Sequence, residues 1–290
     1  MTPIRFPATD GFELAGTLYG DAAGARAAVL IAPAMGVPQS YYADFARWLA
    51  ERGHLVLSFD YRGMGASRPP EHARSLRGFE ADIHTWAEQD AAGALAWLRA
   101  QAPEAAPLHW VGHSLGGQIF GLLPNRELVA RAVTVGSGSG YWRENAPKLR
   151  RMVWWMWYVL VPLALPLAGY FPGKRLKKVG DLPRGVMAQW RRWCLSPHYM
   201  MGEGGAALRR HYAELGTPML SLSFTDDEFM SQRNIESLHG FYAGAPKAMK
   251  RIAPADVGAR RIGHFGFFRL QHQPALWTEV DDWLRPSPLI

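Results

Sequence analysis

The residues with the clearest chemical meaning lie in the segment 111–117, VGHSLGG, which places Ser114 after an apolar run. A serine hydroxyl is a poor nucleophile unless a base lies beside it and the backbone holds it exposed. A tight turn from strand to helix does this, and it needs residues without a side chain nearby. Gly112 and Gly116 lie two residues before and after Ser114, and Gly117 allows a helix to start close to the sheet. The spacing predicts a nucleophile elbow; the alternative is a glycine-rich turn with an incidental serine.

An acid and a base follow Ser114 along the chain. Asp226 and Asp227 follow Thr225 after an apolar run at 218–224, and His264 follows another such run at 248–252. In a catalytic triad, the acid accepts the second ring N–H of the histidine, which fixes the tautomer and stabilises the imidazolium. One carboxylate suffices for this task, so only one of the two aspartates is needed.

Most of the ten histidines have no evident chemical task. Only His239, His264 and His272 follow the two aspartates. We expect His239 in a helix and His272 in or near the last helix, whereas His264 lies in a glycine-containing loop, which favours it as the base. His113 is interpreted as a buried packing residue.

The elements that must position these residues alternate along the chain. Continuous apolar runs are typical of strands buried on both faces, and alternation with helices indicates a mainly parallel sheet covered on both sides. The turn signal Thr9-Asp10-Gly11 predicts an antiparallel hairpin at the start. Strands are expected at 3–7, 12–19, 27–32, 55–59, 107–111, 129–135, 218–224 and 248–252, and helical patterns at 42–52, 80–99 and 115–123.

Four motifs make the chain resemble the α/β-hydrolase superfamily, within it the lineage of serine hydrolases that includes monoglyceride lipases and S33-type peptidases. The likeness covers 3–137 and 216–283, and its carriers are VGHSLGG at 111–117, FDYRGMGAS at 59–67, SFTDDEF at 223–229 and IGHFGFF at 262–268. The resemblance implies the α/β-hydrolase fold. It makes Ser114 the nucleophile, His264 the base and Asp227 the acid, with Asp226 as its neighbour. The 59–67 loop is expected to brace the site.

The resemblance also implies an oxyanion hole made of two backbone N–H groups. One belongs to Leu115, which follows the nucleophile, and the other comes from the loop after the strand 27–32. Many relatives have His-Gly there, whereas this chain has PAMG at 33–36, which places Met35 at the donor position. Because the donor is a backbone group, its side chain can vary.

The sequence lacks the motifs that are typical of cofactor and metal sites. No G-x-G-x-x-G opens a helix, no histidine or acidic cluster suggests a metal site, and Cys194 is the only cysteine. We therefore expect no cofactor, no metal and no nucleic-acid partner. The N-terminus lacks the profile of a secretory signal, so a cytoplasmic enzyme is the default expectation. Oligomeric state cannot be inferred from the sequence.

The segment 139–211 differs in composition from the predicted core at 1–138 and 212–290. It carries thirteen Lys and Arg against three acidic residues, a net +10, whereas the whole chain has +7. The uncharged run 152–171 is long enough to cross a bilayer. A single crossing would separate Ser114 from Asp227 and His264, and prolines at 162 and 166 are expected to interrupt a helix. The segment also contains half of the twelve tryptophans: Trp142, Trp154, Trp155, Trp157, Trp190 and Trp193.

We therefore expect the segment to form a mostly helical cap over the site, as inserts at this position commonly do in the fold. An aromatic cap suits a lipophilic substrate, and its basic residues suit anionic headgroups, which would place the enzyme at the inner membrane surface. The alternative is that the apolar run packs the cap's own core. Candidate substrate-binding residues are Trp154, Trp155, Trp157 and Trp190.

The leading hypothesis is a serine hydrolase that cleaves a lipophilic carboxylic ester through an acyl-enzyme. A thioesterase or acyltransferase would use the same triad, with the basic cap binding an acyl-CoA. A catalytically inactive hydrolase-fold binding protein, or a membrane-associated one, is the third possibility.

Overall fold

In the computed structural model, which describes residues 1–176 and 179–285, the chain forms an eight-stranded sheet of order β1-β2-β4-β3-β5-β6-β7-β8. The β1-β2 and β2-β4 pairs are antiparallel, and every other pair is parallel. This confirms the predicted α/β-hydrolase sheet with its antiparallel lead-in. The strands are β1 (Thr2–Pro7), β2 (Glu13–Tyr19), β3 (Ala27–Ala32), β4 (His54–Phe59), β5 (Leu108–His113), β6 (Val129–Val135), β7 (Met219–Phe224) and β8 (Lys247–Ile252).

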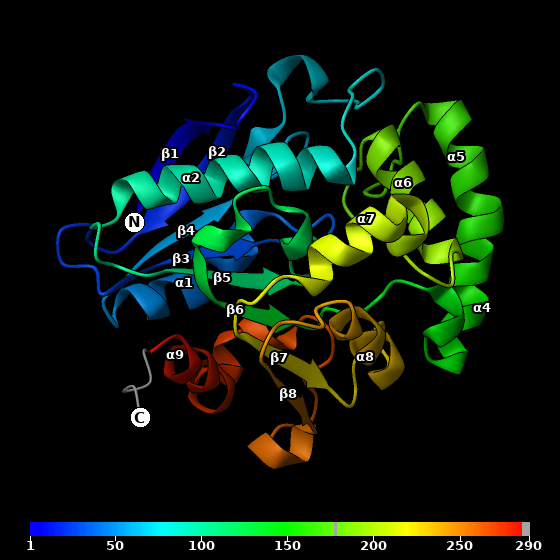
Figure 1. Cartoon of the computed structure of the whole chain (residues 1–290). Helices are drawn as coiled ribbons and strands as arrows, with labels where there is room; N and C mark the ends of the chain where they lie inside the picture. The colour runs from blue at the N-terminus through cyan, green and yellow to red at the C-terminus, as the bar shows by residue number, and fades with distance from the viewer. Residues whose placement is uncertain (177–178, 286–290) are drawn as a thin grey trace.

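Alternate residues of the central strands supply the cores on opposite faces of the sheet. All six residues of β3 are buried. Val29 and Ile31 belong to the apolar cluster that includes α1 (Ala43–Ala50) and α9 (Thr278–Leu284), whereas Leu30 belongs to the cluster that includes α2 (Ala92–Gln101). Figure 1 shows α2 on one side of the sheet and α1 and α9 on the other. The predicted helices on both faces are therefore present.

The chain between β6 and β7 is mostly helical, as predicted for the cap. In Figure 1 these helices lie beyond the ends to which the β5 and β6 arrows point. The last of them continues two residues past the predicted boundary at 211. Lys177 and Lys178, two of the thirteen basic residues of the segment 139–211, lie outside the described residues. The helices are α4 (Pro147–Trp155), a π-helical segment (Met156–Leu160), α5 (Val161–Ala168), α6 (Arg184–Leu195) and α7 (Met201–Ala213), and α8 (Gln232–Gly240) follows β7.

The helix after the elbow is shorter than the apolar pattern at 115–123 predicted. It consists of α3 (Leu115–Gln118), followed by a 3-10 turn (Phe120–Leu122). Leu123 then adopts an extended conformation, with φ −64° and ψ 129°. Since Pro124 disfavours the helical conformation for the residue before it, the helix cannot continue.

The expectation that prolines would interrupt the apolar run at 152–171 was wrong. Helical turns continue from α4 through the π-helical segment into α5 and end at Gly169, which is left-handed with φ 80°. Pro162 has no N–H to donate to the preceding turn, and the Trp157 carbonyl instead accepts a hydrogen bond from Arg191 Nε at 2.6 Å. The helix Leu149–Ala168 is long and apolar enough to cross a membrane by length and composition.

Candidate active site

Ser114 lies at the tip of the turn between β5 and α3, with the unusual backbone angles φ 51° and ψ −111°. Its N–H donates to the Val135 carbonyl at 2.9 Å, which anchors the strained residue to the end of β6. The glycines are required by space. A Cβ on Gly112 would lie 2.5 Å from the Gly116 backbone, and one on Gly116 would lie 2.1 Å from the Ala32 carbonyl oxygen. The turn therefore has the geometry expected of a nucleophile elbow.

The two neighbouring aspartates have different partners. Asp227 Oδ2 accepts a hydrogen bond from His264 Nδ1 at 2.8 Å, with both side chains buried. Its other oxygen accepts the N–H groups of Phe229 and Met230 at 2.8 and 2.9 Å. Asp227 is thus fixed by the backbone in the orientation that lets it hold the histidine ring.

Asp226 instead holds the loop that carries the histidine. Its oxygens accept the N–H groups of Ile262 and Gly263 at 2.9 and 3.1 Å. Glu228 accepts the His264 N–H at 3.1 Å. All three acidic residues after β7 therefore contact the His264 loop, and Asp227 is the one that bonds to the imidazole.

The structure brings Ser114 into the same region as Asp227 and His264. His113, the residue before Ser114, has its ring 5.3 Å from the His264 ring. Gly136, which follows the β6 residue that anchors Ser114, lies so close to the pair that a Cβ there would be 3.3 Å from His264 Nδ1 and 3.5 Å from Asp227 Oδ2. The elbow and the acid–base pair thus meet at the carboxyl ends of adjacent strands.

Met35 and Leu115, the predicted oxyanion donors, both keep an uncommitted backbone N–H. Within residues 1–176 and 179–285, neither group has a hydrogen-bond acceptor, whereas the neighbouring Ala34 N–H donates to Tyr42 Oη at 2.8 Å. The close approach of Gly116 to Ala32 places the start of α3 against the end of β3, from which the Met35 loop leaves. One free donor thus directly follows Ser114, and the other lies in the loop that leaves the end of β3.

A directional series of hydrogen bonds connects the loop after β3 to the loop that carries His264. Tyr42 Oη accepts the Ala34 N–H, so it donates its own hydrogen to His113 Nδ1 at 2.9 Å. His113 then carries its proton on Nε2 and donates to the His264 carbonyl at 3.1 Å. Burial and the neighbouring His264 hold the pKa of His113 well below its usual value, which keeps the ring neutral. His113 is buried, as expected, but its bond to Tyr42 could not be predicted from the sequence because the two residues lie 71 positions apart.

We expect Tyr42→Phe to lower the free energy of unfolding by about 1–3 kcal/mol, because it leaves two buried polar groups without partners. It should also lower kcat on p-nitrophenyl butyrate roughly tenfold, about 1.4 kcal/mol of barrier, because the loops beside Met35 and His264 lose their connection. Urea unfolding and initial rates measure the two effects. Tyr19→Phe, in the same apolar cluster, is the control. A loss of stability with unchanged kcat would show that these hydrogen bonds have only a structural role.

The 59–67 loop contacts the loop after β3, where Tyr61 Oη donates to the Pro33 carbonyl at 3.4 Å. Asp60 accepts the N–H groups of Gln39 and Ala66 at 2.8 and 2.9 Å. Arg62 bonds to the buried Asp90 through its N–H and its Nε, at 2.8 and 2.7 Å. Burial raises the pKa of Asp90 to about 7, although both bonds from Arg62 oppose the rise.

The four candidate tryptophans do not share one environment. Trp154 and Trp155 are exposed on the outer face of α4, whereas Trp157 is 2% exposed and packs edge-on against Trp190 with 5.0 Å between ring centroids. Of the four, only Trp157 and Trp190 thus pack against each other within the segment 139–211.

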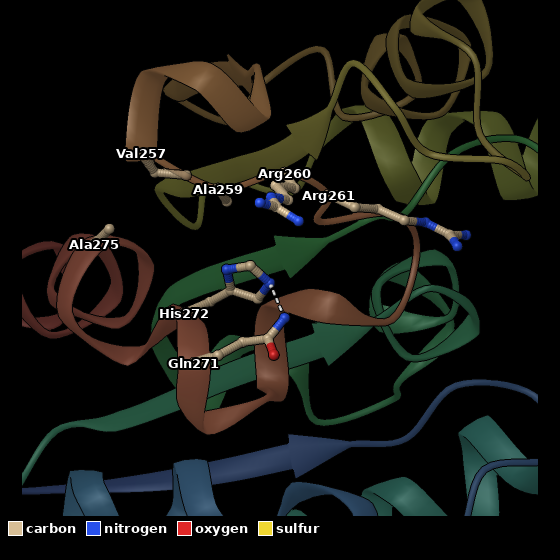
Figure 2. A pocket seen from close by; sticks show the side chains of 8 residues that line it. Val257, Ala259, Arg260, Arg261, Gln271, His272 and Ala275 are labelled. Carbon is tan, nitrogen blue, oxygen red and sulfur yellow. Dashed lines mark hydrogen bonds between the residues drawn. The ribbon is translucent and has the colours of Figure 1, made fainter.

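Two surface cavities lie apart from this site. Figure 2 shows a cavity of about 360 Å³ whose lining includes Arg260, Arg261 and His272, with Gln271 Nε2 donating to His272 Nε2 at 3.0 Å. A larger one, of about 900 Å³, lies between the core and α5 and α6, next to Asp10 and Arg77. Neither is lined by Ser114, Asp227 or His264. Within the described ranges, no group of three or more His, Cys, Asp or Glu residues could hold a metal ion.

Comparison with known proteins supports the fold and identifies the family. A family model described as serine aminopeptidase, S33, matches residues 23–256, a range that contains Ser114 and Asp227 and ends before His264. Comparison with curated proteins gives no significant sequence match.

Several solved structures with a similar fold are described as hydrolases. A soluble variant of monoglyceride lipase from Saccharomyces cerevisiae, in complex with a substrate analogue, gives a TM-score of 0.68 at 16% identity, over 98% of this chain and 94% of that one. An esterase from Pyrococcus furiosus gives 0.61 at 14% identity, over 98% and 91%. A hydrolase from Pseudomonas aeruginosa PA01 gives 0.59 at 20% identity, over 98% and 99%. With its elbow, its sheet and the family match over most of its length, the chain belongs to the S33 serine aminopeptidase family of α/β hydrolases.

Proposed function

We propose that the protein is an esterase or lipase-like serine hydrolase that cleaves the carboxylic ester of a lipophilic acyl group. The observation that carries this proposal is the buried Asp227–His264 hydrogen bond beside the strained Ser114 elbow. These three residues would form the triad, with Ser114 as the nucleophile, His264 as the base and Asp227 as the acid. The yeast monoglyceride lipase and the archaeal esterase with similar folds are consistent with ester substrates.

In the proposed reaction, Ser114 Oγ attacks the ester carbonyl while His264 Nε2 takes the hydroxyl proton. The carbonyl oxygen becomes an oxyanion, which the N–H groups of Met35 and Leu115 would stabilise. His264 returns the proton to the departing alcohol as the carbon–oxygen bond breaks, which leaves an acyl group on Ser114. Water, deprotonated by His264, then attacks the acyl-enzyme. The bond between Ser114 Oγ and the acyl carbon breaks as His264 gives that proton to Oγ, which releases the carboxylic acid and restores the serine. Asp227 holds His264 throughout by accepting the Nδ1 hydrogen.

The lipophilic preference rests on the inner side of the cap. Trp157 and Trp190 form an edge-on aromatic pair within the insert that follows β6. An alkyl chain that leaves water for such a surface gains about 0.8 kcal/mol for each buried CH₂ group. The acyl group is therefore proposed to extend from Ser114 toward this pair.

A series of p-nitrophenyl esters from acetyl to palmitoyl, each below its critical micelle concentration, tests the substrate class. We expect kcat/KM to rise with chain length, by up to about fourfold for each CH₂ that is buried. Trp157→Ala should flatten this dependence, whereas Trp154→Ala, on the outer face of the same helix, should preserve it. An optimum at the acetyl ester would contradict the lipophilic assignment. A preference for CoA thioesters that weakens with added salt would favour a thioesterase instead.

A further inference from the structure

The helix formed by α4, the π-helical segment and α5 has one buried face and one exposed apolar face. The buried residues recur at every fourth position: Leu149, Val153, Trp157, Val161 and Leu165. The exposed apolar face, here called the outer ridge, consists of Met152, Trp154, Trp155, Tyr158, Leu163 and Leu167. In the described part of the chain, ten large apolar side chains are exposed, and six of them belong to this one helix. Figure 1 shows α4 and α5 at the edge of the molecule.

The helix does not need the outer ridge to be apolar in order to fold. Its inner face already packs on the rest of the cap. Polar residues on the outer face would form hydrogen bonds with water, which apolar residues cannot do. Leu163 is 57% exposed and Leu167 is 75% exposed. Contiguous exposed apolar surface of this kind marks an interaction site in soluble proteins.

The charges around the outer ridge indicate the kind of partner. Arg150 and Arg151 are exposed at the start of the helix, and Lys174 and Arg175 are exposed shortly after its end. No acidic residue occurs between Glu144 and Asp181. An apolar stripe with cations at both ends matches the surface of an anionic bilayer, where apolar side chains enter the acyl boundary and cations meet the headgroups.

A second copy of the chain fits the outer ridge less well. Both ends of the helix are positive, so parallel and antiparallel pairing alike would bring like charges together across the interface. A membrane crossing is also disfavoured, because the backbone of this helix is bonded to the rest of the protein. Arg191 bonds to the Trp157 carbonyl, and Arg77 bonds to the Leu167 carbonyl at 2.7 Å.

We propose that the outer ridge docks flat on an anionic lipid bilayer, with the helix axis in the plane of the interface. The helix of about 20 residues would cover about 30 Å of membrane surface. Trp154, Trp155 and Tyr158 would lie at headgroup depth, and Leu163 and Leu167 would enter the acyl region. Docking needs no catalysis, so this proposal holds or fails independently of the proposed hydrolysis.

Flotation of the full-length protein with vesicles tests the docking. Vesicles of phosphatidylcholine alone are compared with an equal mixture of phosphatidylcholine and phosphatidylglycerol. We expect binding to the mixed vesicles, weakened about tenfold by Leu163→Glu because burial of one leucine is lost. Leu270→Glu is the matched control, since Leu270 is 58% exposed and lies outside the cap. Arg150→Gln should weaken binding to the anionic vesicles about fivefold and leave binding to neutral vesicles unchanged.

Circular dichroism of each variant establishes that it is folded, and sedimentation equilibrium gives the oligomeric state. Equal flotation of Leu163→Glu and Leu270→Glu, or no flotation of the wild type, would overturn the proposal. A dimer that Leu163→Glu dissociates, in a protein that ignores vesicles, would assign the outer ridge to a second copy instead. Vesicle binding by a protein without esterase activity would leave the docking intact and contradict the proposed function alone.

Discussion

Replacing Ser114 with alanine is expected to lower kcat/KM for p-nitrophenyl butyrate by roughly 10⁴-fold or more. The variant has no hydroxyl to form the acyl-enzyme, so only the binding and oxyanion contacts remain to accelerate attack by water. Alanine fits the elbow without new contacts, since it merely removes one oxygen. Initial rates measure the loss, and intact mass after treatment with a fluorophosphonate shows whether one serine is labelled.

The control for this variant is Ser221→Ala, which removes the hydroxyl of another buried serine, in β7. We expect it to keep the wild-type rate and to be labelled by the fluorophosphonate. Equal rates for wild type and Ser114→Ala would refute the catalytic assignment. That result would favour the alternative in which the protein is a catalytically inactive binding protein with a hydrolase fold.

Much of the sheet was predictable because its signals are local. The run 27–32 has no polar residue, and β3 is buried throughout, as a central parallel strand must be. The elbow was predictable for a related reason. Gly112 and Gly116 are needed because nearby backbone atoms leave no room for a Cβ. The residues that meet this requirement all lie within one seven-residue segment, so the motif can be recognised in the sequence.

Other features depend on contacts between distant segments, and residue patterns alone could not supply them. The choice of Asp227 as the acid came from the family resemblance. Asp226 and Asp227 are adjacent and chemically identical, and their different tasks arise only when the loop 262–264 packs against them. The Tyr42–His113 bond likewise joins the turn before α1 to the last residue of β5, 71 positions further along the chain. Neither relation leaves a periodic or compositional trace.

The cap shows a further limit of the sequence pattern. Helical spacing alone does not reveal which face of an apolar helix is buried, so Trp154 and Trp157 were equal candidates for the substrate site. The structure separates them, with Trp154 46% exposed and Trp157 2% exposed. The prolines also misled, because the π-helical segment and Arg191 accommodate the missing N–H of Pro162.

The two aspartates offer the sharpest test of the proposed triad, because a single isosteric change can be made at each. In Asp227→Asn, the amide can still accept the Phe229 and Met230 N–H groups, so the loop should keep its shape. Its NH₂ group, however, would face His264 Nδ1 as a donor. The histidine would then carry its proton on Nε2, and it could no longer take the proton of Ser114. We expect kcat to fall by about 10⁴-fold on p-nitrophenyl butyrate.

In Asp226→Asn, one oxygen remains to accept a backbone N–H from the loop at Ile262 or Gly263, and the imidazole contact is untouched. We expect kcat to fall by less than about tenfold in this variant, because it loses only one hydrogen bond between Asp226 and the loop, worth about 1 kcal/mol. Urea unfolding of both variants shows whether either change also lowers the free energy of unfolding. A larger loss in Asp226→Asn than in Asp227→Asn would mean that the histidine is oriented by its loop and not by the buried carboxylate. The difference between the two variants therefore measures what the 2.8 Å bond between Asp227 and His264 contributes to the chemistry, apart from what either aspartate contributes to the fold.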